Sequence, residues 1–255
     1  MNYFSSRSAA ERYKAGRPYY HEATIERIKN FCGFRETPDL GVDVACGTGL
    51  STLALSKICK SVIGIDNSIE MLRIAEKAEN IRYKLGTSEA IDIPDHAATI
   101  MTVASGLHWF DIEKFLAEAQ RVIEPAGWLV IYENAYPGDM EGLSTFKDWY
   151  INSYHAKFPQ TSRNRFDWNQ DVLAKYDFSL VETETHINTI NWNIDDLIRY
   201  LTTHSNVINE VENGKQTIGQ VDEWLKDELT PFFPNKGQRN TLIFSNWIRY
   251  LKKVD

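Results

Sequence analysis

Two carboxylates and a pair of glycines stand out because their types and spacing could hold a ligand that carries a ribose. Asp43 lies in a short apolar run, and the loop 46–49 that follows has glycine at two of its four positions. Such glycines let a backbone approach a ligand closely. Asp66 comes roughly 20 residues later, where an acidic residue typically bonds ribose hydroxyls. These residues predict a ribose-binding site.

One strand–helix–strand unit is expected to position these residues. The apolar runs 40–45 and 61–65 have the length of β-strands, and 50–59 has apolar residues at helical spacing. The strands of such a unit are parallel, with a right-handed crossover. The helix begins at the glycine loop, so its first N–H groups would face the ligand.

The residue types around the glycines favour S-adenosylmethionine (SAM) over a dinucleotide. The dinucleotide fingerprint has a small third residue, where this chain has Thr52. We expect Asp43 to be an unpaired carboxylate beside the loop, which would repel a pyrophosphate and favour a positively charged ligand. SAM has a ribose, an ammonium and a sulfonium, and no phosphate. A glycine turn without a ligand and an NAD-dependent oxidoreductase are the alternatives.

Two core segments resemble the class I SAM-dependent methyltransferases, in the branch called methyltransferase type 11. They are VDVACGTG at 42–49 and VIGIDNSIEML at 62–72. The chain departs from this family at Ala45 and Ala126, where the family usually has glycine. Alanine at the first of these positions still permits close approach of a cofactor.

Three further segments are similar to the trans-aconitate methyltransferase-like subgroup. They are YFSSRSAAERYKAGRPYY at 3–20, GLHWFD at 106–111 and RVIEPAGWLVIY at 121–132. The resemblance covers residues 3–135 well and the rest poorly. It implies an enzyme that binds SAM and methylates a small molecule, with a carboxylic acid as the class that the subgroup suggests. A SAM-binding protein without catalysis is the alternative.

The resemblance and the apolar pattern predict an α/β fold: a Rossmann-like, seven-stranded, mostly parallel sheet with helices on both faces, an antiparallel last strand and helical cap insertions. Further strands are expected at 81–85, 98–104, 128–132, 178–190 and 241–251, and helices at 23–31, 67–79, 111–123, within 139–176 and within 195–229. The predicted parts are an N-terminal lid and flanking helix at 1–36, a SAM-binding core at 37–136, a cap insertion at 137–177, and C-terminal strands at 178–255 with a second cap insertion at 191–235.

Residues at the strand ends and in the N-terminal segment are expected to contact SAM. Ser88 and Glu89 follow a strand, at the position that contacts the adenine amino group in the family. Met71 lies one turn from Asp66 and could touch the adenine, although a core position suits a methionine equally well. The expected cofactor contacts are Tyr13, Arg17, Asp43, Ala45, Gly47, Thr48, Gly49, Asp66, Asn67, Met71, Ser88, Glu89 and Ser105.

The segment after the strand 98–104 is expected to meet the methyl acceptor, because ligands of open α/β sheets bind beyond the carboxyl ends of the strands. His108 is the candidate catalytic base for a hydroxyl or amine acceptor, whereas a carboxylate acceptor needs no base. Tyr20, Trp109 and His204 are the expected acceptor-binding residues. The aromatic N-terminal segment is interpreted as a lid, and packing on the domain surface is its alternative.

Composition limits the class of partner. The 255 residues carry a net charge of −7, and no Lys/Arg run suggests nucleic-acid binding. The three cysteines have no metal-ligand spacing and suit a reducing compartment. The N-terminus lacks the apolar region of a signal peptide. These features predict a cytoplasmic monomer or homodimer without a metal, a nucleic-acid partner or a membrane partner.

Overall fold

The computed structural model describes residues 4–160, 164 and 166–254, which divide into two compact units. Unit 1 comprises the described parts of Met1–Pro18, Asn134–Ser162 and His186–Asn246. Unit 2 comprises the described parts of Tyr19–Glu133, Arg163–Thr185 and Trp247–Asp255. Each unit is therefore assembled from three separate stretches of chain.

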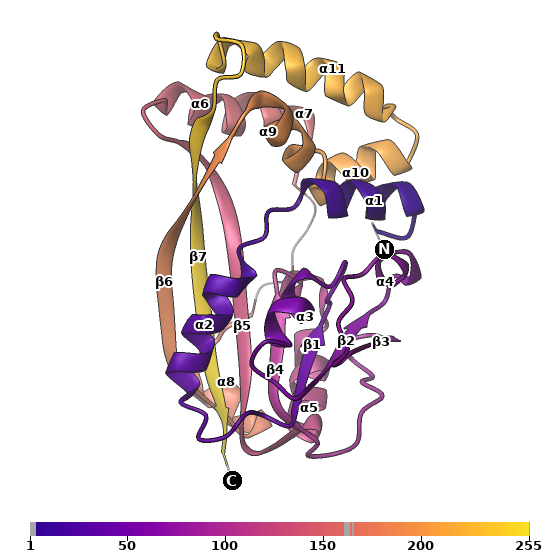
Figure 1. The fold of residues 1–255 in the computed structure, drawn as a ribbon, viewed down its shortest axis with the longest axis vertical. Helices are drawn as coiled ribbons and strands as arrows, with labels where there is room; N and C mark the ends of the chain where they lie inside the picture. Colours follow the sequence, from indigo (N-terminus) through magenta and orange to yellow (C-terminus); the bar gives the residue numbers. More distant parts are fainter. Residues whose placement is uncertain (1–3, 161–163, 165, 255) are drawn as a thin grey trace. The chain divides into compact units, whose positions relative to one another are not determined.

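A seven-stranded sheet has the order β3-β2-β1-β4-β5-β7-β6 (Figure 1). Its strands are β1 Leu40–Val44, β2 Ser61–Asp66, β3 Ile81–Leu85, β4 Ala98–Ala104, β5 Ile123–Met140, β6 Phe178–Trp192 and β7 Asn240–Lys253. The first five strands pair in parallel, and β7 runs antiparallel to its neighbours (Figure 1). The predicted mostly parallel Rossmann-like sheet is thereby confirmed.

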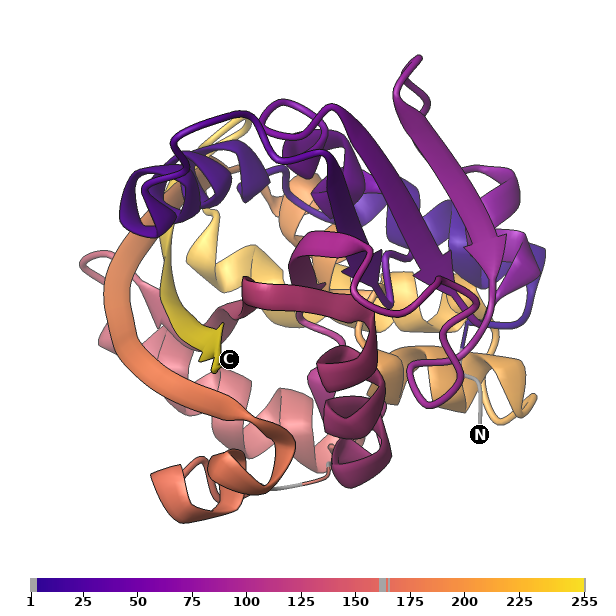
Figure 2. The ribbon, with the colours of Figure 1, turned by 90° about the horizontal axis from the view of Figure 1, so that it is seen from below.

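Helices cover both faces of the sheet in unit 2, because successive side chains of a strand point to opposite faces and apolar ones stand on both. Val42 and Met101 pack in one core cluster with Phe115 of α5 (Ile112–Val122). Ile100, one residue before Met101, packs in another cluster with residues of α2 (His21–Cys32) and α3 (Leu50–Leu55). Figure 2 shows α2 and α5 on opposite sides of these strands. Shorter elements are α4 Ile69–Arg73, η1 Leu107–Trp109, α8 Gln170–Leu173 and η3 Ala174–Tyr176.

Unit 1 is a group of helices around an aromatic core. Its helical elements are α1 Arg7–Gly16, α6 Ser144–Trp149, η2 Tyr150–Tyr154, α7 His155–Lys157, α9 Ile194–Leu201, α10 Ser205–Glu212, α11 Ile218–Leu229 and η4 Thr230–Phe232. Helix α1 packs tightly on α9, since a Cβ atom on Gly16 would lie 2.3 Å from the carbonyl oxygen of Arg199. The N-terminal helix is thus part of the same unit as the helices predicted to form caps.

The helix predicted at 67–79 is much shorter, and the difference has a local cause. Helix α4 ends at Arg73, and the chain then turns back toward the glycine loop. There the Glu76 N–H donates to the Thr48 carbonyl at 3.0 Å, and the Tyr83 hydroxyl donates to the Glu76 carbonyl at 2.6 Å. Residues predicted to continue the helix therefore form hydrogen bonds that hold the glycine loop in place.

Two other predicted elements have different bounds. The helix expected at 50–59 ends at Leu55, where Asn80 donates to the carbonyl oxygens of Ser56 and Cys59 and fixes the turn that follows. The strand expected at 128–132 is the part of β5 that continues in register with β4. The whole strand is longer, because it also includes residues 123–127 and 133–140.

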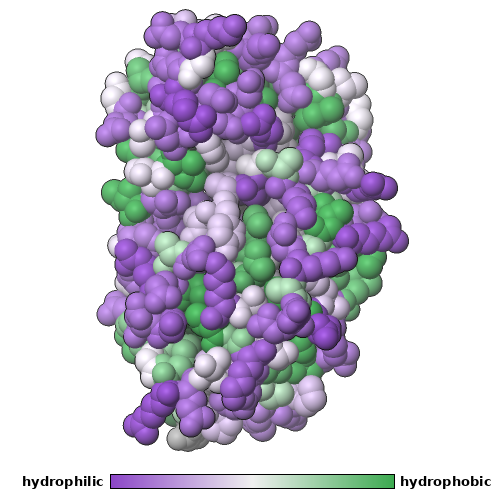
Figure 3. All heavy atoms as spheres, viewed as in Figure 1, coloured by the Kyte–Doolittle hydropathy of each residue, from purple (hydrophilic) through white to green (hydrophobic). Residues whose placement is uncertain are grey.

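Charged and polar side chains dominate the face seen in Figure 3, with apolar side chains scattered among them. Among the described residues, the large apolar side chains that are exposed are Tyr19, Phe31, Ile69, Leu85, Ile151, Val181, Ile187 and Val254. Within the described part of the chain, no helix combines the length and the apolar character that crossing a membrane requires.

Candidate functional site

The glycine loop between β1 and α3 leaves backbone accessible to a ligand. Gly47 has a φ of +53°, and a Cβ atom built on it would meet nothing within 4 Å. Gly49 has a φ of +77° and precedes the first turn of α3. Its Cβ would lie 2.1 Å from the Tyr83 hydroxyl oxygen. Gly49 is therefore required by the packing, whereas Gly47 faces open space that a ligand could fill.

Asp43 is fully buried and is bound by three hydroxyl groups. Its Oδ2 accepts hydrogen bonds from Ser51 at 2.6 Å and Thr52 at 2.7 Å, and its Oδ1 accepts one from Thr102 at 2.9 Å. The expectation of an unpaired carboxylate is wrong, because both oxygens are already occupied. Burial raises the pKa of Asp43 to about 6 although the three donors oppose that shift.

Thr52 acquires a structural explanation from this arrangement. Thr52 stands where the dinucleotide fingerprint has a small residue. In the structure the Thr52 hydroxyl joins the first turn of α3 to Asp43 of β1. The Asp43 carboxylate thus anchors the first turn of α3, and this anchor fixes the end of the glycine loop that precedes the helix. Ser51 and Thr102, which complete this anchor, were not predicted, and a buried aspartate in an apolar strand is the feature that could have suggested nearby donors.

Asp66 is held by backbone donors at the end of β2. Its Oδ2 accepts the Gly47 N–H at 2.8 Å, and its Oδ1 accepts the Ser68 N–H at 2.8 Å. Burial raises the pKa of Asp66, while these backbone donors and that of Asn67 lower it. The carboxylate therefore has a fixed orientation beside the glycine loop. Its predicted contact with ribose hydroxyls is compatible with this position and stays a prediction.

The predicted adenine contacts follow β2 and β3. Met71 of α4 is 2% exposed, and Ser88 is 6% exposed. Glu89 accepts the Asp111 N–H at 3.0 Å through its Oε1 atom. Since Asp111 caps the N-terminus of α5, Glu89 connects the segment after β3 to the segment after β4. The contacts of these three side chains with a cofactor stay predictions.

The segment after β4 brings together several predicted residues within unit 2. Ser105 has a φ of +56°, and its hydroxyl lies 3.3 Å from the Tyr20 hydroxyl. His108 and Trp109 are half-buried in η1, with ring centroids 4.5 Å apart. Gly106 directly follows Ser105. A Cβ atom built on Gly106 would lie 2.6 Å from the Cβ of Ala45. The segment that carries His108 therefore adjoins the glycine loop.

A buried histidine beside this group was not predicted. His21 Nδ1 lies 3.1 Å from the hydroxyl of Tyr132, which pairs with Ala104 at the end of β4. Burial lowers the pKa of His21 to about 3, so the imidazole is neutral. Its ring also contacts Tyr20, with the centroids 4.1 Å apart. Tyr132, an aromatic residue at the end of the strand predicted at 128–132, is the sequence feature that could have indicated this neighbourhood.

Three of the predicted residues belong to unit 1. The Arg17 guanidinium lies over the rings of Tyr13 at 4.7 Å and Tyr200 at 5.4 Å, and it donates to the Thr203 carbonyl at 3.3 Å. His204 Nδ1 lies 2.9 Å from the Tyr154 hydroxyl. Tyr13, Arg17 and His204 therefore gather around one group of aromatic rings. Their contacts with the cofactor or the acceptor stay predictions.

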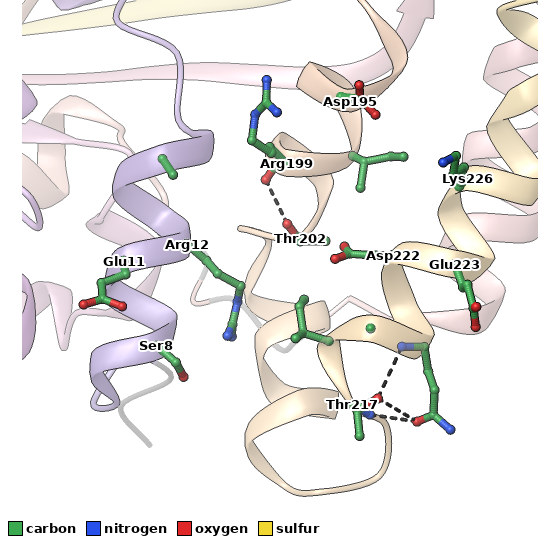
Figure 4. A pocket seen from close by; sticks show the side chains of 15 residues that line it. Ser8, Glu11, Arg12, Asp195, Arg199, Thr202, Thr217, Asp222, Glu223 and Lys226 are labelled. Atoms are coloured by element: carbon green, nitrogen blue, oxygen red, sulfur yellow. Dashed lines mark hydrogen bonds between the residues drawn. The ribbon is translucent and has the colours of Figure 1, made fainter.

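Unit 1 also contains a cavity of about 970 Å³ between α1, α9 and α11 (Figure 4). Side chains of both charges line it, including Glu11, Arg12, Arg199, Asp222 and Lys226. Arg12 also forms an ion pair with Glu212 at 3.1 Å. None of the predicted site residues lines this cavity. It is thus distinct from the residues that the sequence singles out.

Comparisons with known proteins agree with this geometry. The family model described as "Methyltransferase domain" matches residues 42–131. A Dictyostelium discoideum protein named as a methyltransferase is 35% identical over 222 residues, which are 86% of this chain and 83% of that protein.

Two solved structures share the fold. A structure titled as a type II methyltransferase from Anaeromyxobacter dehalogenans has a TM-score of 0.73 and 19% identity, covering 93% of this chain and 98% of that one. A geranyl diphosphate C-methyltransferase from Streptomyces coelicolor, solved with S-adenosyl-L-homocysteine, has a TM-score of 0.50 and 15% identity, covering 91% of this chain and 77% of that one. The chain belongs to the class I SAM-dependent methyltransferases, and SAM is its cofactor.

Proposed function

We propose that this enzyme transfers a methyl group from SAM to a carboxylate of a small organic acid, which yields a methyl ester. The supporting observation is the contact between Gly106 and Ala45. Through it, the segment with His108 and Trp109 adjoins the loop proposed to hold SAM. Two adjoining segments of this kind could bring an acceptor and a methyl donor together.

The proposed cofactor contacts fit the residues present. Gly47 has open space in front of its backbone, and Asp66 is oriented by two backbone donors. In this proposal Asp66 binds the ribose, Ser88 and Glu89 bind the adenine, and Asn67, Thr48 and Ser105 line the site. Asp43 contributes by anchoring the loop. SAM would supply the methyl group: as an acceptor oxygen bonds to the methyl carbon, the carbon–sulfur bond would break and S-adenosyl-L-homocysteine would leave.

The protein's own task is to orient the acceptor and exclude water. Tyr20 and Trp109 are the aromatic residues proposed to do this, and an aromatic face also attracts a sulfonium. A carboxylate acceptor is already a nucleophile at neutral pH, so the role of His108 is then to position it. For a hydroxyl or amine acceptor, His108 would be the base.

A small acid is favoured over a macromolecule for two reasons. The net charge of −7 opposes binding to a nucleic acid. The trans-aconitate-like segments suggest a carboxylic acid, and Arg17 and His204 of unit 1 are the proposed partners of its carboxylates, with Tyr13 beside Arg17.

Transfer of radiolabel from methyl-labelled SAM to a panel of mono-, di- and tricarboxylic acids tests the proposal. We expect label in at least one acid, released as methanol by mild alkali because the product is an ester. His108→Ala is expected to retain turnover within about tenfold for such an acid, whereas removal of a catalytic base costs roughly 10²–10⁴-fold. Label that resists alkali, or that is confined to hydroxyl or amine acceptors, would exclude ester formation.

A further inference from the structure

Four tyrosines of unit 1 form a compact group inside its aromatic core. We call them the tyrosine cluster: Tyr136 of β5, Tyr150 and Tyr154 of η2, and Tyr200 of α9. The ring of Tyr136 lies 5.3 Å from that of Tyr150 and 5.9 Å from that of Tyr200, and Tyr150 stacks on Tyr154 at 5.2 Å. All four are at most 8% exposed.

The phenol groups of this cluster are neutral hydrogen-bond donors. Burial raises the pKa of Tyr136 and of Tyr154 well above the ordinary value. The rings of Tyr150 and Tyr200 lie beside that of Tyr136, and their phenols raise both pKa values further. Donors gathered in an apolar interior suit an acceptor that carries negative charge.

Positive charge is present at the same cluster. The Arg17 guanidinium lies 5.4 Å from the centroid of the Tyr200 ring, and it lowers the pKa of Tyr154. The His204 ring contacts both Tyr154 and Tyr200, at 5.8 Å and 4.7 Å. Asp139, whose carboxylate raises the pKa of Tyr136, is paired with Lys147 at 2.8 Å. Negative charge is thus neutralised on that side.

The Tyr136 hydroxyl is the group in the cluster that indicates a binding site. It is buried and has no hydrogen-bond partner within the described part of the chain, and Tyr136 itself is 8% exposed. Buried polar groups are almost always bonded, because leaving one unsatisfied is unfavourable. By contrast, the Tyr154 hydroxyl bonds both the Leu201 carbonyl and His204.

We propose that the tyrosine cluster binds a carboxylate of a small organic acid, with the Tyr136 hydroxyl donating to that carboxylate and Arg17 supplying the charge. A single guanidinium among neutral phenols matches the single charge of a carboxylate better than the double charge of a phosphate. The proposal rests on the proposed function in one respect, since it takes the acid to be the methyl acceptor. Tyr136 is then a specificity-determining residue that neither the family motifs nor the comparisons assign.

The decisive variant is Tyr136→Phe, with Tyr250→Phe as its matched control. Tyr250 is also buried, but its hydroxyl donates to Glu184 at 3.1 Å within unit 2. The wild-type protein and both variants are titrated calorimetrically with mono-, di- and tricarboxylic acids, and their Tm values are measured without ligand. We expect Tyr136→Phe to bind the best acid about tenfold more weakly without a lower Tm. Tyr250→Phe should show a lower Tm and an unchanged affinity.

Two outcomes would overturn the proposal: no acid in the panel binds the wild-type protein, or Tyr136→Phe binds it as tightly as the wild type does. Titration with S-adenosyl-L-homocysteine in the same samples reports on the cofactor site separately. An acid that binds in a Tyr136-dependent manner and accepts no methyl group would contradict the proposed function and leave the tyrosine cluster as a binding site. An acid that is methylated but binds Tyr136→Phe as tightly as the wild type would support the proposed function and exclude the tyrosine cluster as its binding site.

Discussion

The Cβ atom of Ala45 occupies the space that a side chain at position 106 would need. A Cβ atom on Gly106 would lie 2.6 Å from it, whereas the next nearest atoms are 3.8 Å away. Gly106 has a φ of −107°, which other residues adopt readily. Glycine is therefore required at position 106 by the methyl group of Ala45, and the loops after β1 and β4 are fitted to one another.

This relationship predicts a compensating pair of substitutions. Gly106→Ala should lower the free energy of unfolding by about 1–3 kcal/mol because it overpacks the contact. In the Ala45→Gly background the same change should be nearly neutral, since the remaining neighbours stand at ordinary contact distance. Urea unfolding of the wild type, both single variants and the double variant measures the coupling. Additive effects would show that another contact limits position 106.

Ala45 and Ala126 share a left-handed backbone, with φ of +57° and +55°. They are the two positions where the related family usually has glycine. Because alanine costs roughly 1–2 kcal/mol in this region, and glycine returns part of this as chain entropy, Ala45→Gly and Ala126→Gly should each raise stability by up to about 1 kcal/mol. Ala126 is exposed near the start of β5, and Ala126→Gly serves as the control, with unchanged SAM affinity. A fall in Tm for both variants would contradict the strain argument.

Asp66→Ala should weaken SAM binding by about 1–3 kcal/mol, because it removes the proposed ribose contact and frees the Gly47 N–H. Calorimetric titration with SAM measures the change. Asp92→Ala removes an exposed carboxylate that pairs with Lys84 and should leave the affinity unchanged. Equal SAM affinities of the wild type and Asp66→Ala would show that Asp66 does not bind the cofactor.

His21 should make the protein less stable in acid. Its pKa is about 3 in the folded chain and 6.5 ordinarily, so the unfolded chain binds the proton first as the pH falls. Stability from this group is complete above pH 6.5, and about 2 kcal/mol of it is lost between pH 6.5 and 5. Unfolding free energies across this range should fall less steeply for His21→Gln. Identical slopes would mean that His21 can be protonated in the folded state.

Thr102→Val should destabilise the protein more at high pH than at low pH. Since the pKa of Asp43 is about 6 when folded and 3.8 ordinarily, protonation of this carboxyl favours the folded state, and its favourable contribution is lost as the pH rises from 4 to 6. Above pH 6 the buried charge depends on the Thr102 hydroxyl, and the substitution should cost about 2 kcal/mol. At pH 5 the cost should be smaller. Unfolding titrations at pH 5 and pH 8 measure it, and a cost without pH dependence would mean that Asp43 does not change its protonation state between these pH values.

Local sequence patterns predicted much of the sheet. Strands β3 and β4 have the predicted bounds, because β3 alternates apolar or aromatic residues with charged ones and β4 is a short, mostly apolar run. The length of α4 was wrong, because Glu76 bonds Thr48 of a distant loop, and helical spacing carries no information about that contact.

The environment of Asp43 was also mistaken, for a related reason. One of its three donors, Thr102, is 59 residues away in sequence, and only the pairing of β1 with β4 brings it close. The motifs located the cofactor loop, which depends on neighbouring residues. The tyrosine cluster draws its rings from β5, η2 and α9, and no local pattern predicts such an assembly.

The composition of unit 1 from three stretches has a practical consequence for exchanging this unit between relatives. Met1–Pro18, Asn134–Ser162 and His186–Asn246 are interleaved with the stretches of unit 2. No single gene fragment encodes this unit, so a chimera that exchanges only one stretch would pair foreign helices with resident ones. A functional graft from a relative would need all three stretches, joined after α1, inside β5, β6 and β7, and between positions 162 and 163.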